Sequence, residues 1–507
     1  MNSKPILVTG ATGYVGGRLI PRLLASGYRV RAMARSLAKL KYRPWAQDPR
    51  VELTEGDMLE PVSLKKSVTG CFAAFYLVHD IHSQKTALSE INRKAARNMA
   101  VAAADAHLEK MIYLAELGTE KDIQRRHRLR AGDEVAHILQ SGPVPITVFF
   151  ATFILGSGSA SFEMLRYLVD RMPVMLLPRW GNQTCQPIAI RNVLNYLTGC
   201  LENEQTTGKA FDIGGHDVLT FQELMDVYAE EAGLPRRIMI PGPFIPTGLS
   251  AYWIHLISPL PASVTEPLTR GFQVPLVCTD QSTIRSILPQ RLLTCRETIR
   301  LALERIQQER VETRWSDAGD LKSPEWTYCG DAAYAGGTIL ECGYRVHLRA
   351  TPEEIWQTVC RIGGNTGWYF GNVLWRIRGG LDSLIGGSGL KRGRRHPSQL
   401  LVGDCLDFWR VLEVEPHRYL LLLAEMKMPG EGLMEIRITT LDHEKTEVQM
   451  FSRFLPKGLS GLLYWYVLYP FHQWIYRGIL KSIAKSIKKP ITFGPKRFTS
   501  KLPGRYP

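Results

Sequence analysis

The sequence predicts two domains: an α/β domain with a doubly wound parallel sheet, then an α+β domain of antiparallel strands. Three observations support this. The chain has 507 residues, which is too many for one ordinary core. Strand and helix patterns alternate through the first half, as in parallel sheets. After residue 335, strand patterns follow one another directly, and one long helical pattern closes the series.

The first strand and helix enclose a glycine-rich turn. "KPILVTG" has the pattern of a buried strand, and "GGRLIPRLLASG" has that of the following helix. A helix N-terminus offers free N–H groups, and glycines let a pyrophosphate approach the backbone. This context predicts a dinucleotide site, although a tight turn without a ligand remains the alternative. The residues predicted to hold the ligand here are Thr9, Gly10, Thr12, Gly13, Tyr14, Val15 and Gly16.

The second strand, "YRVRAMAR", ends at Arg35, where an NAD-preferring site would carry an acidic residue. Because an arginine there accommodates a 2′-phosphate, Arg35 with Ser36 and Lys39 favours NADP(H), with NAD possible. The alternative is that Arg35 covers the adenine or points into water.

Further strands are expected in "VELTEGDML", "CFAAFYLVH", "KMIYLAELG" and "PITVFFATFILG". The first of these is expected to end at Asp57. Asp57, Met58 and Val78 are predicted to contact the cofactor, since ligands bind at the carboxyl ends of parallel strands.

These segments, with "AARNMAVAAADA", "GSGSASFEMLRYLV" and "FDIGG", resemble the atypical short-chain dehydrogenases, and most closely their NmrA-like branch. The resemblance covers residues 1–305 in collinear order. It implies a Rossmann fold, a nicotinamide dinucleotide, and either oxidoreductase activity or redox sensing. The first domain is expected to span residues 1–310, with its substrate side in residues 155–300.

The acid–base pair of that family, Tyr-x-x-x-Lys, is missing. Aligning Glu134 with the family's usual glutamate places Arg126 and Arg130 at the two positions, and the serine position falls near Ala115 and Glu116. Arginine does not exchange protons near neutral pH, so Arg130 is expected only to hold a ribose or phosphate. His79 and His127 are the remaining catalytic candidates. An ordinary hydrogen-bonded histidine is at least an equal interpretation of His79.

On the substrate side, the polar candidates are Arg179, Trp180, Gln186 and the loop at residues 157–161. Residues 240–277 are rich in proline, aromatic residues and leucine, which suits a pocket for a large apolar molecule. A hydrophobic lid packed on the sheet explains the same composition equally well.

A linker is expected over residues 311–334, and a second domain over residues 335–495. There, Thr351 and Glu354 form a capping box for a helix, and Glu435 lies in an alternating strand pattern. The order of elements resembles the START-like (SRPBCC) helix-grip fold. The segments around "GWYFGNVLW" resemble an uncharacterised domain often fused to this dehydrogenase branch. The resemblance implies a hydrophobic small molecule or lipid as ligand, in a cavity that side chains could equally fill.

Two basic features mark the second domain. "KRGRR" at residues 391–395 is a candidate phosphate site, with a solvated loop as the alternative. In the last helix, isoleucines lie on one face and basic residues on the other. This pattern suits peripheral contact with an anionic membrane, but a grip helix that buries its isoleucines in its own domain is the preferred interpretation. The two sets are Ile475, Ile479, Ile483 and Ile487, and Arg477, Lys481, Lys485 and Lys489.

Composition narrows the partners and the compartment. The formal net charge is +15, but no nucleic-acid motif accompanies it, so no nucleic-acid partner is expected. Nine scattered cysteines without metal-ligand spacing predict reduced thiols and no metal site. The first residues do not read as a signal peptide, which predicts a cytoplasmic protein, with membrane contact at most peripheral. Two function classes remain: an oxidoreductase acting on a hydrophobic substrate, and a non-catalytic NADP(H) sensor or scaffold.

Overall fold

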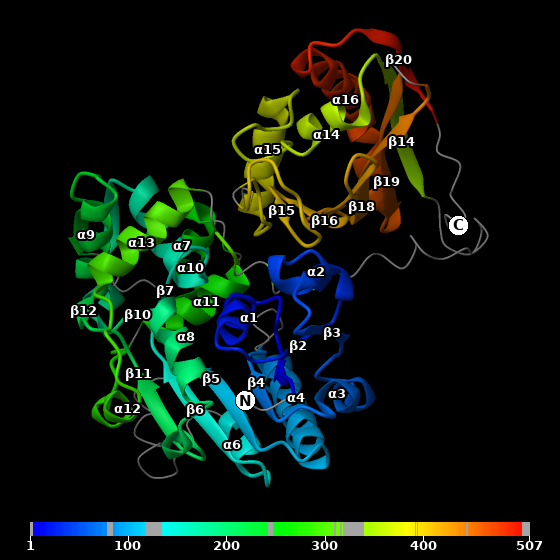
Figure 1. Cartoon of the computed structure of the whole chain (residues 1–507). Helices are drawn as coiled ribbons and strands as arrows, with labels where there is room; N and C mark the ends of the chain where they lie inside the picture. Colours follow the sequence, from blue (N-terminus) through cyan, green and yellow to red (C-terminus); the bar gives the residue numbers. More distant parts are fainter. Residues whose placement is uncertain are drawn as a thin grey trace. The chain divides into compact units, whose positions relative to one another are not determined.

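The chain divides into two compact units, Met1–Ala318 and Gly319–Pro507, called here the N-terminal and the C-terminal domain (Figure 1). The computed structural model describes residues 4–78, 85–117, 134–177, 179–241, 247–258, 260, 262–272, 274–308, 311–314, 317, 339–390, 392, 394–442 and 445–498. Among these residues, no helix combines the length and the apolar character that a membrane span requires.

The N-terminal domain is built on a seven-stranded parallel sheet of order β11-β6-β5-β4-β1-β2-β3. Its strands are β1 (Ile6–Val8), β2 (Val30–Ala34), β3 (Val51–Glu55), β4 (Ala73–Tyr76), β5 (Lys110–Glu116), β6 (Ile146–Ala151) and β11 (Ala210–Ile213). This is the predicted doubly wound, Rossmann-like sheet. The strand order reverses between β1 and β4, so the adjoining carboxyl ends form the crevice where such sheets bind ligands.

Helices cover both faces of this sheet, and each layer has its own apolar core (Figure 1). On one face lie α1 (Gly16–Ala25) and α8 (Ile190–Gly199); on the other lie α3 (Pro61–Val68), α4 (Lys85–Asp105) and α6 (Glu134–Gln140). The short α2 (Leu37–Lys41) and η1 (Pro44–Gln47) connect β2 to β3. Buried aliphatic runs such as Ile6–Val8 form the strands because the sheet is covered on both sides.

A smaller lobe follows β6 and has a separate core that includes Phe153, Phe221 and Phe272. Its helices are α7 (Ala160–Arg171), α9 (Phe221–Glu231), α10 (Thr247–Ile257), α11 (Ala262–Gly271) and α13 (Cys295–Gln307), with the turn η2 (Arg179–Asn182). The helix α12 (Ser282–Ile287) and the turn η3 (Glu204–Thr206) instead pack with the main sheet. Its strands are β7 (Ile154–Leu155), β8 (Val174–Leu177), β9 (Thr184–Cys185), β10 (Ile188–Ala189), β12 (Leu219–Thr220) and β13 (Ile238–Pro241). Where α10 and α11 are described, Ile254 and Val264 belong to this core, which favours the packed lid over an open pocket wall.

The C-terminal domain is a seven-stranded antiparallel sheet of order β15-β16-β17-β18-β19-β14-β20. The strands are β14 (Leu340–Leu348), β15 (Cys405–Leu406), β16 (Trp409–Glu415), β17 (Tyr419–Ala424), β18 (Gly430–Thr440), β19 (Thr446–Pro456) and β20 (Ile491–Arg497). The helices are α14 (Pro352–Val359), α15 (Asn372–Leu384) and α16 (Gly458–Ser486). The expected strand, helix, strands and long helix are present. The specific START-like assignment stays a prediction.

Several local expectations differ from the structure. β3 ends at Glu55 rather than at Asp57, and "PITVFFATFILG" forms two strands, β6 and β7. Residues 311–314 and 317, expected in the linker, pack within the N-terminal domain. Glu435 was expected on a half-buried strand, but it is only 2% exposed, because Arg437 and Arg453 pair with it over that face of the sheet.

Candidate nucleotide site

The carboxyl ends of the parallel strands bring the predicted cofactor residues to one edge of the N-terminal sheet. The glycine turn follows β1, Arg35 follows β2, Asp57 comes shortly after β3, and Val78 follows β4. Parallel pairing of β1 with both β2 and β4 fixes this arrangement. The sequence predicted the grouping correctly because strand polarity alone determines it.

The three glycines of the turn differ in what a side chain at each position would contact. Gly10 has φ +66°, and a Cβ there would lie 2.7 Å from the Leu77 carbonyl oxygen. A Cβ at Gly16 would lie 2.3 Å from the Gly10 carbonyl oxygen. At Gly13, a Cβ would meet only the Gly10 oxygen, at 3.1 Å, and nothing else within 4 Å. Gly10 and Gly16 are therefore required by the turn itself, whereas a Cβ at Gly13 would meet a single tight contact among the described residues. The approach of a pyrophosphate at Gly13 stays a prediction.

Other residues of the turn stabilise it from behind. The Thr9 hydroxyl donates to the Phe75 carbonyl at 2.9 Å and accepts from the Leu77 amide at 3.1 Å, which ties β1 to β4. Burial raises the pKa of Tyr14 to about 12, and the Arg18 guanidinium lies over its ring. Thr12 is buried, and the helix begins after Val15 with no acidic residue in its first turn. An anion is favoured at such a helix N-terminus.

The basic residues after β2 have different environments. Arg35 is exposed, and Ser36 precedes α2 without a side-chain capping bond. Lys39 is buried, and its ammonium group donates to the Asp317 carbonyl at 3.0 Å. Arg35 is therefore exposed at the end of β2, whereas the Lys39 ammonium group is engaged by a backbone carbonyl. A contact of Arg35 and Ser36 with a ribose phosphate stays a prediction.

Residues 311–314 and 317, called here the strap, pack against the glycine turn. Thr313 accepts a hydrogen bond from Arg18 at 2.8 Å and donates to the Tyr14 carbonyl at 2.9 Å. Asp317 forms a buried ion pair with Arg43 at 3.1 Å, and Arg43 also reaches the Thr12 carbonyl at 3.4 Å. The strap thus holds α1 and the loop after β2 together. No motif in the sequence indicated this contact.

Asp57, Met58 and Val78 complete the edge. One Asp57 carboxylate oxygen accepts from the Leu59 amide at 2.9 Å, which shapes the turn after β3. Met58 is buried, and its carbonyl accepts from Asn98 of α4 at 2.9 Å. Val78 is half-buried beside the core of the second helical layer.

The predicted catalytic residues, His79 and His127, and the predicted ribose ligand Arg130 lie outside the described residues, as does Arg126. At the described end of β5, Ala115 is buried and Glu116 is exposed. Glu116 is therefore a titratable group at the ligand edge, where the family's serine was expected. The position was identified from the sequence, but its acid–base capacity was not considered.

On the substrate side, several predicted polar groups have structural roles. Gln186 is buried, donates to the Gly215 carbonyl at 3.0 Å and accepts from the Cys278 amide at 3.0 Å. Ser159 caps α7, and the Ser157 carbonyl accepts from Arg18 at 2.7 Å. The side chains of Arg179 and Trp180 lie outside the described ones.

The basic run near residue 391 is neither a phosphate site nor a solvated loop where it is described. Arg392 pairs with Glu425, and Arg395 pairs with Asp404 at 2.8 Å. Arg394 donates to the carbonyls of Cys360 and Ile362. The Arg392 and Arg410 guanidiniums hold the pKa of Glu425 at about 2, against the opposing effect of burial. These arginines fasten the loop to the sheet.

The last helix buries its isoleucine face within its own domain. Ile475, Ile479 and Ile483 belong to the C-terminal core, and Ile487 packs against it. On the other face, Arg477 donates to the Tyr344 hydroxyl at 2.9 Å. Lys489, expected on the same face, lies beyond the end of α16 at Ser486 and pairs with Glu354 at 2.9 Å. Lys481 and Lys485 are exposed. The grip-helix alternative therefore describes this helix, and membrane contact stays a prediction.

Comparison with protein families agrees with the division into two domains. Residues 10–142 match a family model described as NAD(P)H-binding. Residues 334–479 match the model of a protein of unknown function, DUF2867. The predicted nicotinamide dinucleotide is thereby confirmed as NAD(P)(H), whereas the choice between NADP and NAD stays a prediction.

Curated relatives match part of the chain. Cinnamoyl-CoA reductase 1 of Oryza sativa is 30% identical over 117 residues, which are 22% of this chain and 34% of that protein. Dihydroflavonol 4-reductase of Hordeum vulgare is 36% identical over 81 residues, 15% of this chain and 23% of that protein. Photosystem II assembly factor Ycf39 of Cyanophora paradoxa is 29% identical over 117 residues, which are 23% of this chain and 35% of that protein. The chain thus spans about a third or less of the length of these relatives.

Solved structures with a similar fold include the Bordetella bronchiseptica enzyme WbmG in complex with NAD, at 14% identity and a TM-score of 0.47, covering 62% of this chain and 97% of that one. UDP-glucose 4-epimerase of Thermotoga maritima is 13% identical, with a TM-score of 0.44. The match covers 60% of this chain and 99% of that one. The N-terminal domain thus contains an NAD(P)H-binding region that is similar to part of several reductases, and the C-terminal domain is similar to DUF2867.

Proposed function

We propose that the protein is an NADP(H)-dependent oxidoreductase that reduces a carbonyl group on a hydrophobic, lipid-like substrate. The observation that carries this proposal is the open space at Gly13, at the strand-end edge that also holds Arg35. Two relatives with reductase names support the reaction type. The START-like interpretation of the C-terminal domain supports the hydrophobic substrate, because a helix-grip sheet can enclose an apolar ligand.

The chain's own residues would bind and orient the reactants. The backbone of the glycine turn would hold the pyrophosphate, and Arg35 with Ser36 would hold the ribose phosphate. The bound dinucleotide supplies the hydride chemistry. For the proton we propose the sequence-derived candidates His79 and His127, because a histidine can carry a proton near neutral pH.

The experiment that tests this function follows nicotinamide absorbance while the full chain is mixed with NADPH and cinnamoyl-CoA, a dihydroflavonol or methyl hexyl ketone. We expect NADPH oxidation with at least one of these carbonyl compounds. The variant that lacks the proton donor, either His79→Asn or His127→Asn, should lose about hundredfold or more in kcat. Its affinity for NADPH should remain that of the wild type. NADPH binding without any oxidation would contradict the enzymatic proposal.

A second candidate function is a non-catalytic NADP(H) sensor or scaffold. The specific observation for it is the pair of arginines, Arg126 and Arg130, at the positions of the family's tyrosine and lysine. A relative named as an assembly factor is consistent with such a role. Tight NADPH binding without turnover over the carbonyl panel would favour this candidate.

Arg35 gives a prediction for cofactor choice. NADPH should bind more tightly than NADH, and Arg35→Asp should narrow or reverse that preference by about tenfold or more, because a charge-assisted phosphate contact is lost. Both nucleotides are titrated calorimetrically into wild type and variant. Lys66→Asp, an equal charge change on the exposed side of α3, is the control and should leave the ratio unchanged. Equal wild-type affinities would refute the role of Arg35.

A further inference from the structure

The C-terminal domain encloses an apolar cavity of about 250 Å³ between its sheet and the helices α15 and α16. Aromatic, leucine and methionine side chains form most of its wall. Trp409 of β16 and Ser452 of β19 contribute from the sheet, and Trp375 and His472 contribute from the helices. The volume lies just below the ligand-pocket range of about 300–1,000 Å³, which limits the cavity to a small ligand. It equals the share of about eight water molecules at about 30 Å³ each.

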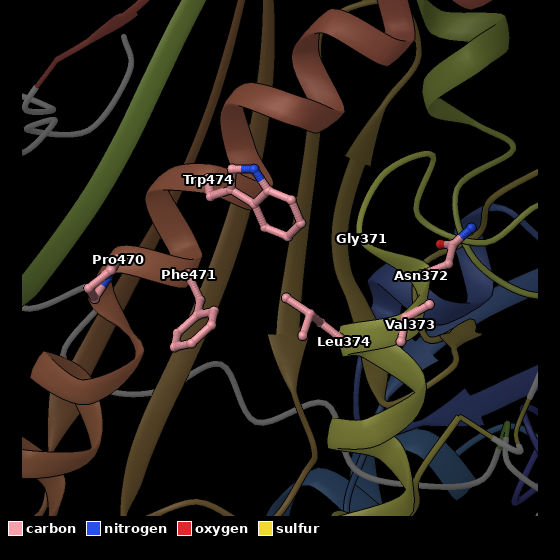
Figure 2. A pocket seen from close by; sticks show the side chains of 7 residues that line it. All are labelled: Gly371, Asn372, Val373, Leu374, Pro470, Phe471 and Trp474. Carbon is pink, nitrogen blue, oxygen red and sulfur yellow. The ribbon is translucent and has the colours of Figure 1, made fainter.

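A wider surface pocket of about 720 Å³ adjoins this cavity and shares Leu374 and Phe471 with it. Figure 2 shows Leu374 of α15 reaching toward Phe471 and Trp474 of α16 across this pocket. Trp474 is 54% exposed and Phe471 is 47% exposed. Large exposed aromatic side chains at the border of an apolar cavity provide an entrance for an apolar molecule.

Polar atoms of the cavity wall lack protein partners. Trp409 Nε1, Ser452 Oγ, His472 Nδ1 and Arg378 Nε are all buried, and none has a hydrogen-bond partner among the described residues. Trp409 and Ser452 are each 6% exposed. Ser452 Oγ lies near the Tyr476 hydroxyl, but without normal hydrogen-bond geometry. Burial raises the pKa of Tyr476, and the nearby Ser452 hydroxyl lowers it in part. Buried polar groups in folded proteins normally have partners, so this set is exceptional.

These atoms lie on opposite sides of the cavity. Trp409 pairs with Ala424 across β16 and β17, and the same row of the sheet continues through Gly432 to Phe454. Three strand spacings of about 4.8 Å therefore separate the Trp409 backbone from β19, which carries Ser452, by roughly 14 Å. Ser452 lies near Tyr476, one helical turn beyond His472. A ligand lying along the cavity thus meets polar atoms at both ends and apolar groups between them.

The arginine side chains of the cavity wall lie close to carboxylates of the same domain. Arg378 lies 3.6 Å from the fully buried Asp382, and Arg453 lies 3.1 Å from Glu341 and 3.8 Å from Glu435. Burial lowers the pKa of His472 to about 4, so this imidazole is neutral near pH 7. An ionised ligand would lose its hydration here without gaining an unopposed counter-charge.

We propose that this cavity binds an uncharged, apolar molecule of about eight to ten non-hydrogen atoms that carries a carbonyl or hydroxyl oxygen. Trp409 Nε1 is only a donor, as is Arg378 Nε, so they require an oxygen acceptor. The inference deepens the hydrophobic-ligand part of the proposed function and rests on it, but it does not require hydride transfer.

The test titrates the full chain with methyl hexyl ketone, octanol and octanoate, followed by tryptophan fluorescence, because tryptophans line the cavity. We expect saturable binding of the ketone and the alcohol, and at least about tenfold weaker binding of octanoate near neutral pH. Trp409→Phe keeps an aromatic, though smaller, ring and removes the donor, so it should weaken ketone binding about fivefold. Equal binding of octanoate, or no binding of the neutral probes, would overturn the proposal.

A pair of glycine variants locates the site. Gly432 lines the cavity, and a Cβ there would make only ordinary contacts, the nearest at 3.4 Å from Met428 Sδ. Gly432→Leu should therefore fill the cavity and abolish binding of the neutral probes, whereas Gly380→Leu, on α15 with nothing within 4 Å, should bind them as wild type does. NADPH affinity, measured in the same samples, should be unchanged in both. If the wild-type protein failed to bind NADPH, the proposed function alone would be contradicted. If Gly432→Leu still bound the neutral probes, only the proposal that they occupy this cavity would be contradicted.

Discussion

Gly13→Val is expected to lower the affinity for NADPH at least about hundredfold while the thermal unfolding temperature stays close to that of wild type. The added side chain would enter the open space at the turn, where its Cβ meets only the Gly10 oxygen. It would therefore displace the pyrophosphate from the backbone, while the Gly10 carbonyl would have to shift by only a few tenths of an ångström. Isothermal titration with NADPH and a thermal melt of the unliganded protein measure the two effects.

Gly16→Val provides the contrasting variant. A Cβ at Gly16 would lie 2.3 Å from the Gly10 carbonyl oxygen, so the turn itself must rearrange. This variant should lose both NADPH affinity and thermal stability. If Gly13→Val bound NADPH as tightly as wild type, the dinucleotide would not lie against this turn.

The strand, tight turn and helix that hold Gly10, Gly13 and Gly16 could be predicted from the sequence, because glycines at this spacing leave few backbone geometries. The different contacts of the three glycines could not. The same reasoning predicted that Arg35, Asp57 and Val78 share one edge. Strand polarity fixes both results. Local chemistry also predicted the capping box of Thr351 and Glu354, which the structure contains.

The partners of charged side chains could not be predicted in this way. "KRGRR" reads equally well as a phosphate site or a solvated loop, and only the fold places Glu425 and Asp404 opposite Arg392 and Arg395. Similarly, the alternating pattern around Glu435 gives no sign of Arg453 on the neighbouring strand. The pairing depends on strand register, which composition and periodicity do not specify.

The residues that line the cavity of the C-terminal domain could not be predicted from the sequence either. Trp409 and Ser452 read as ordinary strand residues, and His472 as part of a helix. Their shared surroundings arise only when β16, β19 and α16 pack together. The sequence could indicate an apolar module, but not whether its interior is filled. The answer depends on small residues such as Gly432, which leaves space that a larger side chain would fill.

The strap depends on contacts that are still more distant in sequence. Arg18 and Thr313, 295 residues apart, form a hydrogen bond, and the carboxylate of Asp317 meets both Arg43 and the Arg314 amide. The Arg43 and Asp317 side chains are only 8% and 6% exposed. Because the strap ends the N-terminal domain and touches the glycine turn, it links the stability of that domain to the geometry of the nucleotide site.

Asp317→Ala is accordingly expected to reduce the free energy of unfolding of the N-terminal domain by about 3–5 kcal/mol, because Arg43 would remain buried without its counter-charge. Denaturant unfolding with and without NADPH identifies the relevant transition, since a bound ligand stabilises the domain that holds it. NADPH affinity should also fall, because Arg43 reaches the Thr12 carbonyl in the turn. The double variant Arg43→Met with Asp317→Leu should recover much of the lost stability, since no charge is left unpaired. An unchanged transition in Asp317→Ala would show that the strap does not stabilise the nucleotide site.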